Sequence, residues 1–211
     1  EKVSPKTSIV LFAGLVAGVF LPIALLLGLD LLRFRIEGRK DLERLTRLPI
    51  LADIPVAKGL DKKKDERAVV VRENFNDVIE EAFRGLRTNI GFVLKPGEKV
   101  IMTTSCIPGE GKTFVAANLA MSLALLGKRV IVVGLDIRKP RLVALFGLKP
   151  TKLGIVNFLC GSEPDYELLE SQIIPSGIHK NMDVLPAGII PPNPAELLSG
   201  SMLKDAIKYL S

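Results

Sequence analysis

One short segment constrains the fold of this chain more than any other. Residues 105–113, SCIPGEGKT, join a β-branched apolar run at 99–104 to a strongly apolar run at 114–126. The first run predicts a buried strand, and the second predicts a helix that Gly127 ends. Residues 128–133 predict a second strand, so the segment is the first strand-to-helix turn of a βαβ unit. The sequence therefore predicts an α/β fold with a mostly parallel sheet flanked by helices.

The composition of this turn is typical of a phosphate-binding loop. Glycine lets the chain curl so that backbone N–H groups at 109–112 converge on phosphate oxygens, and the following helix directs its positive end at the anion. Lys112 adds a positive charge for the β- and γ-phosphates, and the Thr113 hydroxyl suits Mg²⁺. We therefore expect ATP and Mg²⁺ to bind here. The expected nucleotide contacts are Ser105, Pro108, Gly109, Glu110, Gly111, Lys112, Thr113 and Phe114.

One position departs from the usual G-x-x-x-x-G-K-[ST] pattern, because Cys106 replaces the first glycine. The alternative interpretation is a glycine turn with an incidental lysine. The strand and helix predicted on either side favour a P-loop NTPase-like site, since structural context is what confirms such a motif.

An acidic residue, Asp136, follows the second predicted strand. The carboxyl ends of neighbouring parallel strands gather at one edge of a sheet, so Asp136 should lie beside the phosphate loop. From there its carboxylate can reach Mg²⁺ or an incoming hydroxyl group. The alternative is that Asp136 only caps a helix starting near Pro140.

A long apolar run at residues 7–29 contains no charged side chain. About 20 apolar residues cross ~30 Å of hydrocarbon as a helix, so the run predicts a transmembrane helix. A cleaved signal peptide would need a shorter apolar core, whereas this run continues into Asp30 and Arg33. Gly14 and Gly18 have the spacing of a helix-pairing motif, although glycine is also common in membrane helices.

The charges around this run predict its orientation. Only Lys2 and Lys6 precede it, whereas the basic residues that follow it are Arg33, Arg35, Arg39, Lys40, Arg44 and Arg47. The excess of positive charge places the C-terminal side in the cytoplasm. We expect a transmembrane helix with its flanks at 1–32, a connector with a solvated charge run at 33–68, and a folded domain at 69–211. A chain that begins so close to its membrane helix is expected to be the C-terminal part of a longer protein.

Residues 76–90 have helical periodicity, with Asn74 or Asn76 as candidate caps. The expected apolar stripe consists of Val78, Phe83, Leu86 and Ile90. Glu81, Arg84 and Arg87 are spaced three residues apart, so they line one edge of the helix. Without further context this edge predicts only ordinary surface ion pairs.

Composition argues against several other functions. The net charge of +6 lies mainly in the membrane flank and the connector, and the few aromatic residues do not alternate with basic ones, which disfavours a nucleic-acid partner. Cys106 and Cys160 form no C-x-x-C pair, and His179 has no neighbours for a metal cluster. Neither a disulfide nor a zinc site is predicted.

Taken together, the motifs resemble those of the bacterial tyrosine kinases, the cytoplasmic half of polysaccharide chain-length determinant proteins. The resemblance covers most of the chain. It rests on the phosphate loop, Asp136-x-Arg138, Glu81-x-x-Arg84-x-x-Arg87, LPIL at 48–51 and NPAELL at 193–198.

The resemblance implies roles for particular residues. Lys112, Asp136 and Arg138 would act in catalysis, and Thr113 and Asp136 would hold Mg²⁺. Glu81, Arg84 and Arg87 would join neighbouring subunits into a homo-oligomeric ring. It further implies a location in the bacterial inner membrane and the polysaccharide polymerisation and export machinery as partner.

Two features depart from the family pattern. Gly134 stands where the family usually has the first aspartate of D-x-D-x-R, so one carboxylate near the metal is lost. The family's Walker B aspartate and its tyrosine-rich tail would follow Ser211. The tyrosines of this chain, Tyr166 and Tyr209, are not clustered in sequence and are expected to pack or to face solvent.

Three functions are compatible with these observations. The first is an ATP-dependent protein-tyrosine autokinase that regulates polysaccharide chain length and export. The second is a nucleotide-dependent assembly scaffold without useful phosphoryl transfer, which Gly134 favours. The third is a partition-type ATPase, but that class carries an extra lysine where this chain has Ile107.

Overall fold

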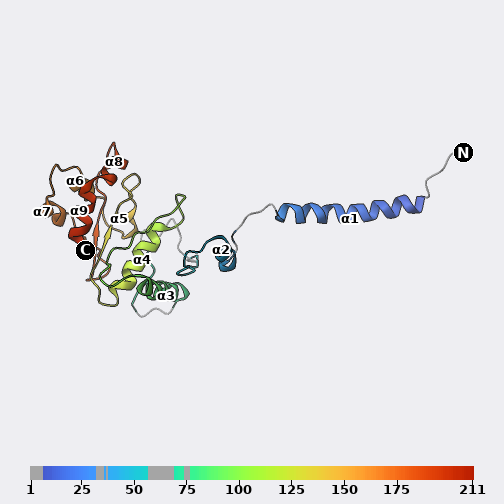
Figure 1. The fold of residues 1–211 in the computed structure, drawn as a ribbon, viewed down its shortest axis with the longest axis horizontal. Coiled ribbons are helices and arrows are strands. Elements are labelled where there is room, and N and C mark those ends of the chain that lie inside the picture. The colour runs from blue at the N-terminus through green and yellow to red at the C-terminus, as the bar shows by residue number, and fades with distance from the viewer. Residues whose placement is uncertain (1–6, 32–35, 37, 57–68, 74–76) are drawn as a thin grey trace. The chain divides into compact units, whose positions relative to one another are not determined.

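A computed structural model describes residues 7–31, 36, 38–56, 69–73 and 77–211 (Figure 1). The chain divides into two compact units, Glu1–Ile50 and Leu51–Ser211. The second unit thus begins earlier than the domain start expected at Val69, because Leu51, Ala52 and Ile54 pack against its core. The charge run at 61–67 lies outside the described residues, as do the basic residues Lys2, Lys6, Arg33 and Arg35 and the candidate caps Asn74 and Asn76.

In the described part of the first unit, the helices are α1 (Thr7–Leu31) and α2 (Arg39–Leu45). The apolar side chains of α1 from Ile9 to Leu29 are exposed on all sides, with Leu11 and Phe12 each 71% exposed. Within the described residues, α1 is the one helix that is long and apolar enough to cross a membrane. On α2 the guanidinium of Arg39 pairs with Glu43 one turn later, at 2.9 Å.

The second unit has an α/β fold with a small sheet. Strand β1 (Val130–Val133) runs parallel to β3 (Met182–Leu185), and β2 (Ile174–Pro175) pairs with β3 in the antiparallel direction. The strand order within the described residues is β1-β3-β2. The helices are α3 (Val78–Val93), α4 (Lys112–Ala124), α5 (Leu142–Leu145), α6 (Ile155–Leu159), α7 (Tyr166–Ser171), α8 (Pro194–Ser199) and α9 (Ser201–Leu210).

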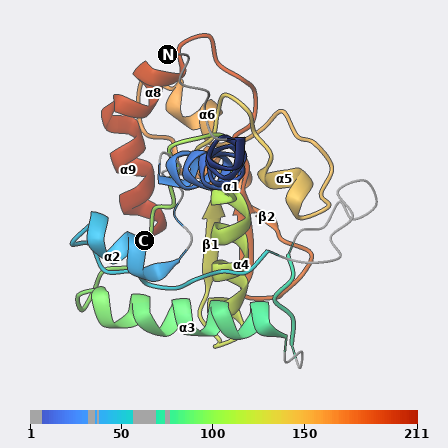
Figure 2. The same cartoon turned by 90° about the vertical axis from the view of Figure 1, so that its right-hand side faces the viewer.

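Helix α4 is the centre of this unit. It packs against β1 and α3 (Figure 2), and small residues such as Ala117 and Ala124 are fully buried on it. The buried Oδ1 of Asn118 accepts hydrogen bonds from the N–H groups of Val70 and Val71, at 2.7 and 3.1 Å. The predicted helix and its end are confirmed, since Gly127 follows α4 with φ +79° and donates its N–H to the carbonyl of Ala124.

The strand predicted at 99–104 is wrong. Its residues form no β-ladder with any described segment, and Val100 and Met102 are 52% and 79% exposed. A β-branched apolar pattern predicts a tendency to be buried between neighbours, but a strand also needs a partner for its backbone groups. The second predicted strand is confirmed as β1.

Helix α3 forms where it was predicted, with two corrections. Asp77 is its N-cap, and the Asp77 carboxylate accepts a hydrogen bond from the N–H of Val78. Val78 is 73% exposed, and Ile79 is buried in its place beside Phe83 and Leu86. Five residues separate Val78 from Phe83, which is about 140° around a helix, so the two cannot share one stripe.

Candidate functional site

The phosphate loop has the backbone form that its sequence predicts. Gly109 and Gly111 have φ values of +96° and +94°, a region that favours glycine. Gly111 is the N-cap of α4, so the unpaired N–H groups of the first turn of α4 adjoin the loop. The carboxylate of Glu110 accepts a hydrogen bond from the N–H of Ile107 at 3.1 Å, which closes the loop on itself. This is a backbone shape suited to an anion.

Lys112 and Asp136 meet at this loop. The Nζ of Lys112, in the first residue of α4, lies 2.8 Å from Oδ2 of Asp136, which follows β1. The sequence predicts that Asp136, at the end of β1, lies beside the phosphate loop. The ion pair with Lys112 connects the end of β1 to the start of α4. Both side chains are about one third exposed, at 33% and 34%, so they border solvent.

The surroundings of Asp136 favour its ionised form. Partial burial raises the pKa of Asp136, but hydrogen bonds from Lys112 and from the N–H of Lys139, with the charges of Lys112 and Arg141, outweigh that effect. The pKa therefore lies below its ordinary value. The hydrogen bond from the N–H of Lys139 to Asp136 is a local contact between residues three positions apart. The N-cap of α5 is Arg141, not Asp136. The cap-only alternative therefore fails.

The oxygen donors near the loop suit Mg²⁺. The Thr113 hydroxyl and the Asp136 carboxylate are hard oxygen ligands, and Mg²⁺ commonly uses one or two carboxylates together with phosphate oxygens and water. Among the residues that the structure describes, no group of three or more His, Cys, Asp or Glu side chains could form a closed metal cage. Arg138, two residues after Asp136, is exposed.

Gly134 lies against the backbone of the neighbouring strand. Its N–H donates to the carbonyl of Leu185 at 2.9 Å. A Cβ added to Gly134 would stand 3.2 Å from the N of Ala187 and 3.3 Å from Cδ2 of Leu142. The position that lacks the family's first carboxylate is therefore also too tightly packed for a side chain to enter without a shift.

The edge of α3 with Glu81, Arg84 and Arg87 is only partly available to a partner. Arg84 pairs with Glu80 at 2.7 Å and approaches Glu81 at 3.7 Å. Arg87 turns inward, where its Nη1 donates to the carbonyl and the hydroxyl of Ser122 on α4, at 2.7 and 3.1 Å. The sequence reasoning missed the contributions of Glu80 and Ser122, because a three-residue spacing does not reveal which face of the helix is buried.

Other predicted residues have ordinary surroundings. Cys106 and Cys160 are free and exposed. The Nδ1 of His179 accepts a hydrogen bond from the N–H of Asn181 at 3.1 Å. The rings of Tyr166 and Tyr209 stack with centroids 4.4 Å apart, so the two tyrosines cluster in space although they are distant in sequence. The carboxylate of Glu170 accepts a hydrogen bond from the Tyr209 hydroxyl and thereby raises the pKa of that tyrosine.

The fold and the loop define the class of this protein as a P-loop NTPase-like nucleotide-binding protein. Residues 97–211 match the family model described as ParA, NUBPL iron-transfer P-loop NTPase. The chain is 38% identical over 141 residues to the tyrosine-protein kinase YwqD of Bacillus subtilis, covering 66% of this chain and 57% of that protein. It is 30% identical over 220 residues to the tyrosine-protein kinase wzc of Salmonella typhimurium, covering 98% of this chain and 30% of that protein.

A solved structure gives the same assignment. The kinase domain of the Escherichia coli tyrosine kinase ETK superposes with a TM-score of 0.72 at 28% identity, covering 83% of this chain and 68% of that one. The chain belongs to the bacterial tyrosine-kinase family, and the match covers most of its length. The chain spans about 30% of the length of several curated relatives that it matches.

Proposed function

We propose that this chain is part of an ATP-dependent protein-tyrosine autokinase that regulates the length and export of a capsular polysaccharide or exopolysaccharide. The observation that carries the proposal is the 2.8 Å contact between Lys112 and Asp136 at the phosphate loop. It brings a cation suited to phosphate and a carboxylate suited to an acceptor hydroxyl to one point. The relatives described as tyrosine-protein kinases support the choice of acceptor.

Catalysis in this proposal depends on positioning and electrostatics. The N–H groups from Gly109 to Lys112 hold the phosphates, and Lys112 neutralises charge on the group that is transferred. Asp136 orients the acceptor hydroxyl and takes up its proton, and Arg138 adds positive charge at the same loop. Mg²⁺, held by Thr113 and Asp136, would supply further neutralisation of phosphate charge.

The remaining proposals concern assembly and location. Helix α1 anchors the protein in the bacterial inner membrane, with the C-terminal domain in the cytoplasm. Glu81 and Arg84 contribute to the contact between copies in a homo-oligomeric ring, and Arg87 supports that edge through α4. The polysaccharide polymerisation and export machinery is the partner.

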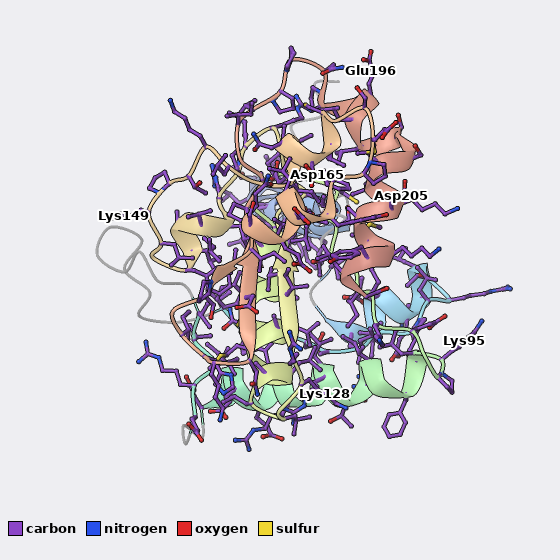
Figure 3. All side chains as sticks on the ribbon, turned by 90° about the vertical axis from the view of Figure 1, so that its left-hand side faces the viewer. Lys95, Lys128, Lys149, Asp165, Glu196 and Asp205 are labelled. Atoms are coloured by element: carbon purple, nitrogen blue, oxygen red, sulfur yellow. The ribbon has the colours of Figure 1, made fainter. Side chains whose placement is uncertain are left out.

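The test is a phosphotyrosine assay of the full-length protein with ATP. We expect Asp136→Asn to abolish most of the signal, whereas Asp205→Asn, which changes a carboxylate on α9 (Figure 3), should retain it. The absence of phosphotyrosine in the wild-type protein would refute the kinase proposal.

A second candidate function is supported by Gly134. The family's first carboxylate is missing at that position, and a side chain there would meet the backbone of Ala187. A protein that binds ATP and changes its oligomeric state with ATP, but forms no phosphotyrosine, would be a nucleotide-dependent assembly scaffold. The same assay, combined with sedimentation in the presence and absence of ATP, separates the two functions.

A further inference from the structure

An acidic cavity of about 510 Å³ lies along the N-terminal half of α3. Carboxylates line it at Asp53, Asp77, Glu80 and Glu81, and the cation among its described lining residues is the guanidinium of Arg84. None of these residues belongs to the phosphate loop. Because negative charge is in excess along the lining, the cavity is suited to a positively charged ligand.

The walls of the acidic cavity are held in place by the fold. One wall is α3, and the other is the connector from Asp53 to Pro55. Leu51 and Ile54, in the same part of the connector, pack against the core. The Nδ2 of Asn89 donates to the carbonyl of Leu51 at 2.6 Å, which ties the connector to α3. The site is therefore preformed, and its volume is within the usual range for small ligands.

The side chain of Glu80 indicates that a ligand binds in the acidic cavity. This side chain is 5% exposed, and its Oε1 accepts a hydrogen bond from Nη2 of Arg84 at 2.7 Å. Its other oxygen, Oε2, is buried and has no hydrogen-bond partner in the described parts of the chain. Leaving a buried carboxylate oxygen without a partner costs free energy, and a bound hydrogen-bond donor would recover that cost.

An ammonium group suits this oxygen better than a metal ion does. Within the described ranges, no three His, Cys, Asp or Glu side chains are grouped so that they could hold a metal ion. An ammonium group needs no such cage, because it donates up to three separate hydrogen bonds. Pro55, Val78 and Ala82 provide apolar surface for the methylene groups that join one ammonium group to the next.

We propose that the acidic cavity binds an aliphatic polyamine. One ammonium group donates to Oε2 of Glu80, and the others lie at the exposed carboxylates of Asp53 and Asp77. The guanidinium of Arg84, whose side chain is 42% exposed, shifts to admit the first ammonium group. Binding requires neither ATP nor phosphoryl transfer.

The test is isothermal titration calorimetry of the full-length protein with spermidine at low ionic strength, without ATP. We expect Glu80→Gln, which keeps the size of the side chain and removes its charge, to weaken binding by about tenfold or more. Asp53→Asn, at an exposed position, should weaken it by about two- to fivefold without any risk to the core. Glu167→Gln is the matched control, because it removes a charge from an exposed position of α7 that does not line the cavity.

A second variant should change the affinity in the opposite direction. Arg84→Gln removes the cation that competes for Glu80, so we expect spermidine to bind about two- to tenfold more tightly. A variant that only disturbed the fold would not bind the ligand better. The increase therefore distinguishes a binding site from a structural role of the ion pair.

Three results would overturn the polyamine site. The first is equal affinity in the wild type, Glu80→Gln and Glu167→Gln. The second is full displacement of spermidine by an equal concentration of Mg²⁺, which would indicate general charge screening. The third is absence of spermidine binding together with a change in the sedimentation of Glu80→Gln, which would assign the cavity to a neighbouring copy of the chain.

Discussion

The Nζ of Lys112 lies 2.8 Å from Oδ2 of Asp136, although the two residues are far apart in the sequence. One residue begins α4 and the other follows β1. The contact therefore depends on how α4 packs against β1 and is not a local feature of the loop. It places the charge of a phosphate-binding lysine and that of a nearby carboxylate at one point.

Removing the lysine should weaken nucleotide binding. We expect Lys112→Ala to lower the affinity for ATP by about 10- to 100-fold, because hydrogen bonds to charged groups contribute roughly 1.5–3 kcal/mol. Isothermal titration calorimetry measures the effect. Lys128→Ala is the control, since Lys128 lies at the far end of the unit in Figure 3 and is exposed. Equal losses in both variants would contradict a specific role for Lys112.

The pKa of Asp136 predicts the pH range in which the ion pair stabilises the fold. This pKa is lower in the folded protein than the ordinary value of about 3.9. The stabilisation is therefore fully present above that ordinary value and is lost as the pH falls through the lower folded pKa. Thermal unfolding in detergent should show wild type more stable than Asp136→Asn at pH 6, with the difference vanishing at acid pH. A difference that grew on acidification would contradict the assignment.

Some features could be predicted from the sequence because they depend on local pattern. Helix α4, strand β1 and the loop glycines follow from periodicity and from the φ values that glycine favours. The position of Asp136 followed from a general rule about parallel sheets. The helix, the strand and the glycines each need only a segment and its immediate neighbours, whereas the position of Asp136 beside Lys112 also depends on the packing of α4 against β1.

Other features depend on contacts between distant segments, which a single sequence does not reveal. The run at 99–104 has the composition of a strand but pairs with no described segment. The inward turn of Arg87 depends on Ser122, which lies 35 residues later. The acidic cavity on α3 depends on Asp53 and Pro55, which lie in the connector and well before α3 in the sequence.

The contact between Arg87 and Ser122 should stabilise the fold within one copy of the chain. Arg87→Ala removes two hydrogen bonds between α3 and α4, so we expect a loss of about 1–3 kcal/mol of unfolding free energy. Thermal unfolding in detergent measures it, and Arg129→Ala removes the same charge from an exposed position. A purely intersubunit role would make the loss depend on protein concentration. We expect the same loss across a range of concentrations.

Restoring a side chain at Gly134 should be destabilising. The Cβ would lie 3.2 Å from the backbone N of Ala187, just after β3, and that backbone can yield only by shifting. We expect Gly134→Asp and Gly134→Ala to lose a similar amount, about 1–3 kcal/mol, because both carry the same Cβ into a packed site. Thermal unfolding of the two variants beside the wild type measures the loss.

Gly91→Ala is the matched control for the added methyl group. Gly91 is an exposed residue of α3, and a Cβ there would have no neighbour within 4 Å. This variant should gain about 0.5–1 kcal/mol, because alanine restricts the unfolded chain more than glycine does. Wild-type stability in Gly134→Ala would show that the sheet end accepts a side chain. Packing would then not explain why glycine stands at the position of the family's first aspartate. Gly134→Asp would become a direct test of whether the missing carboxylate limits phosphoryl transfer.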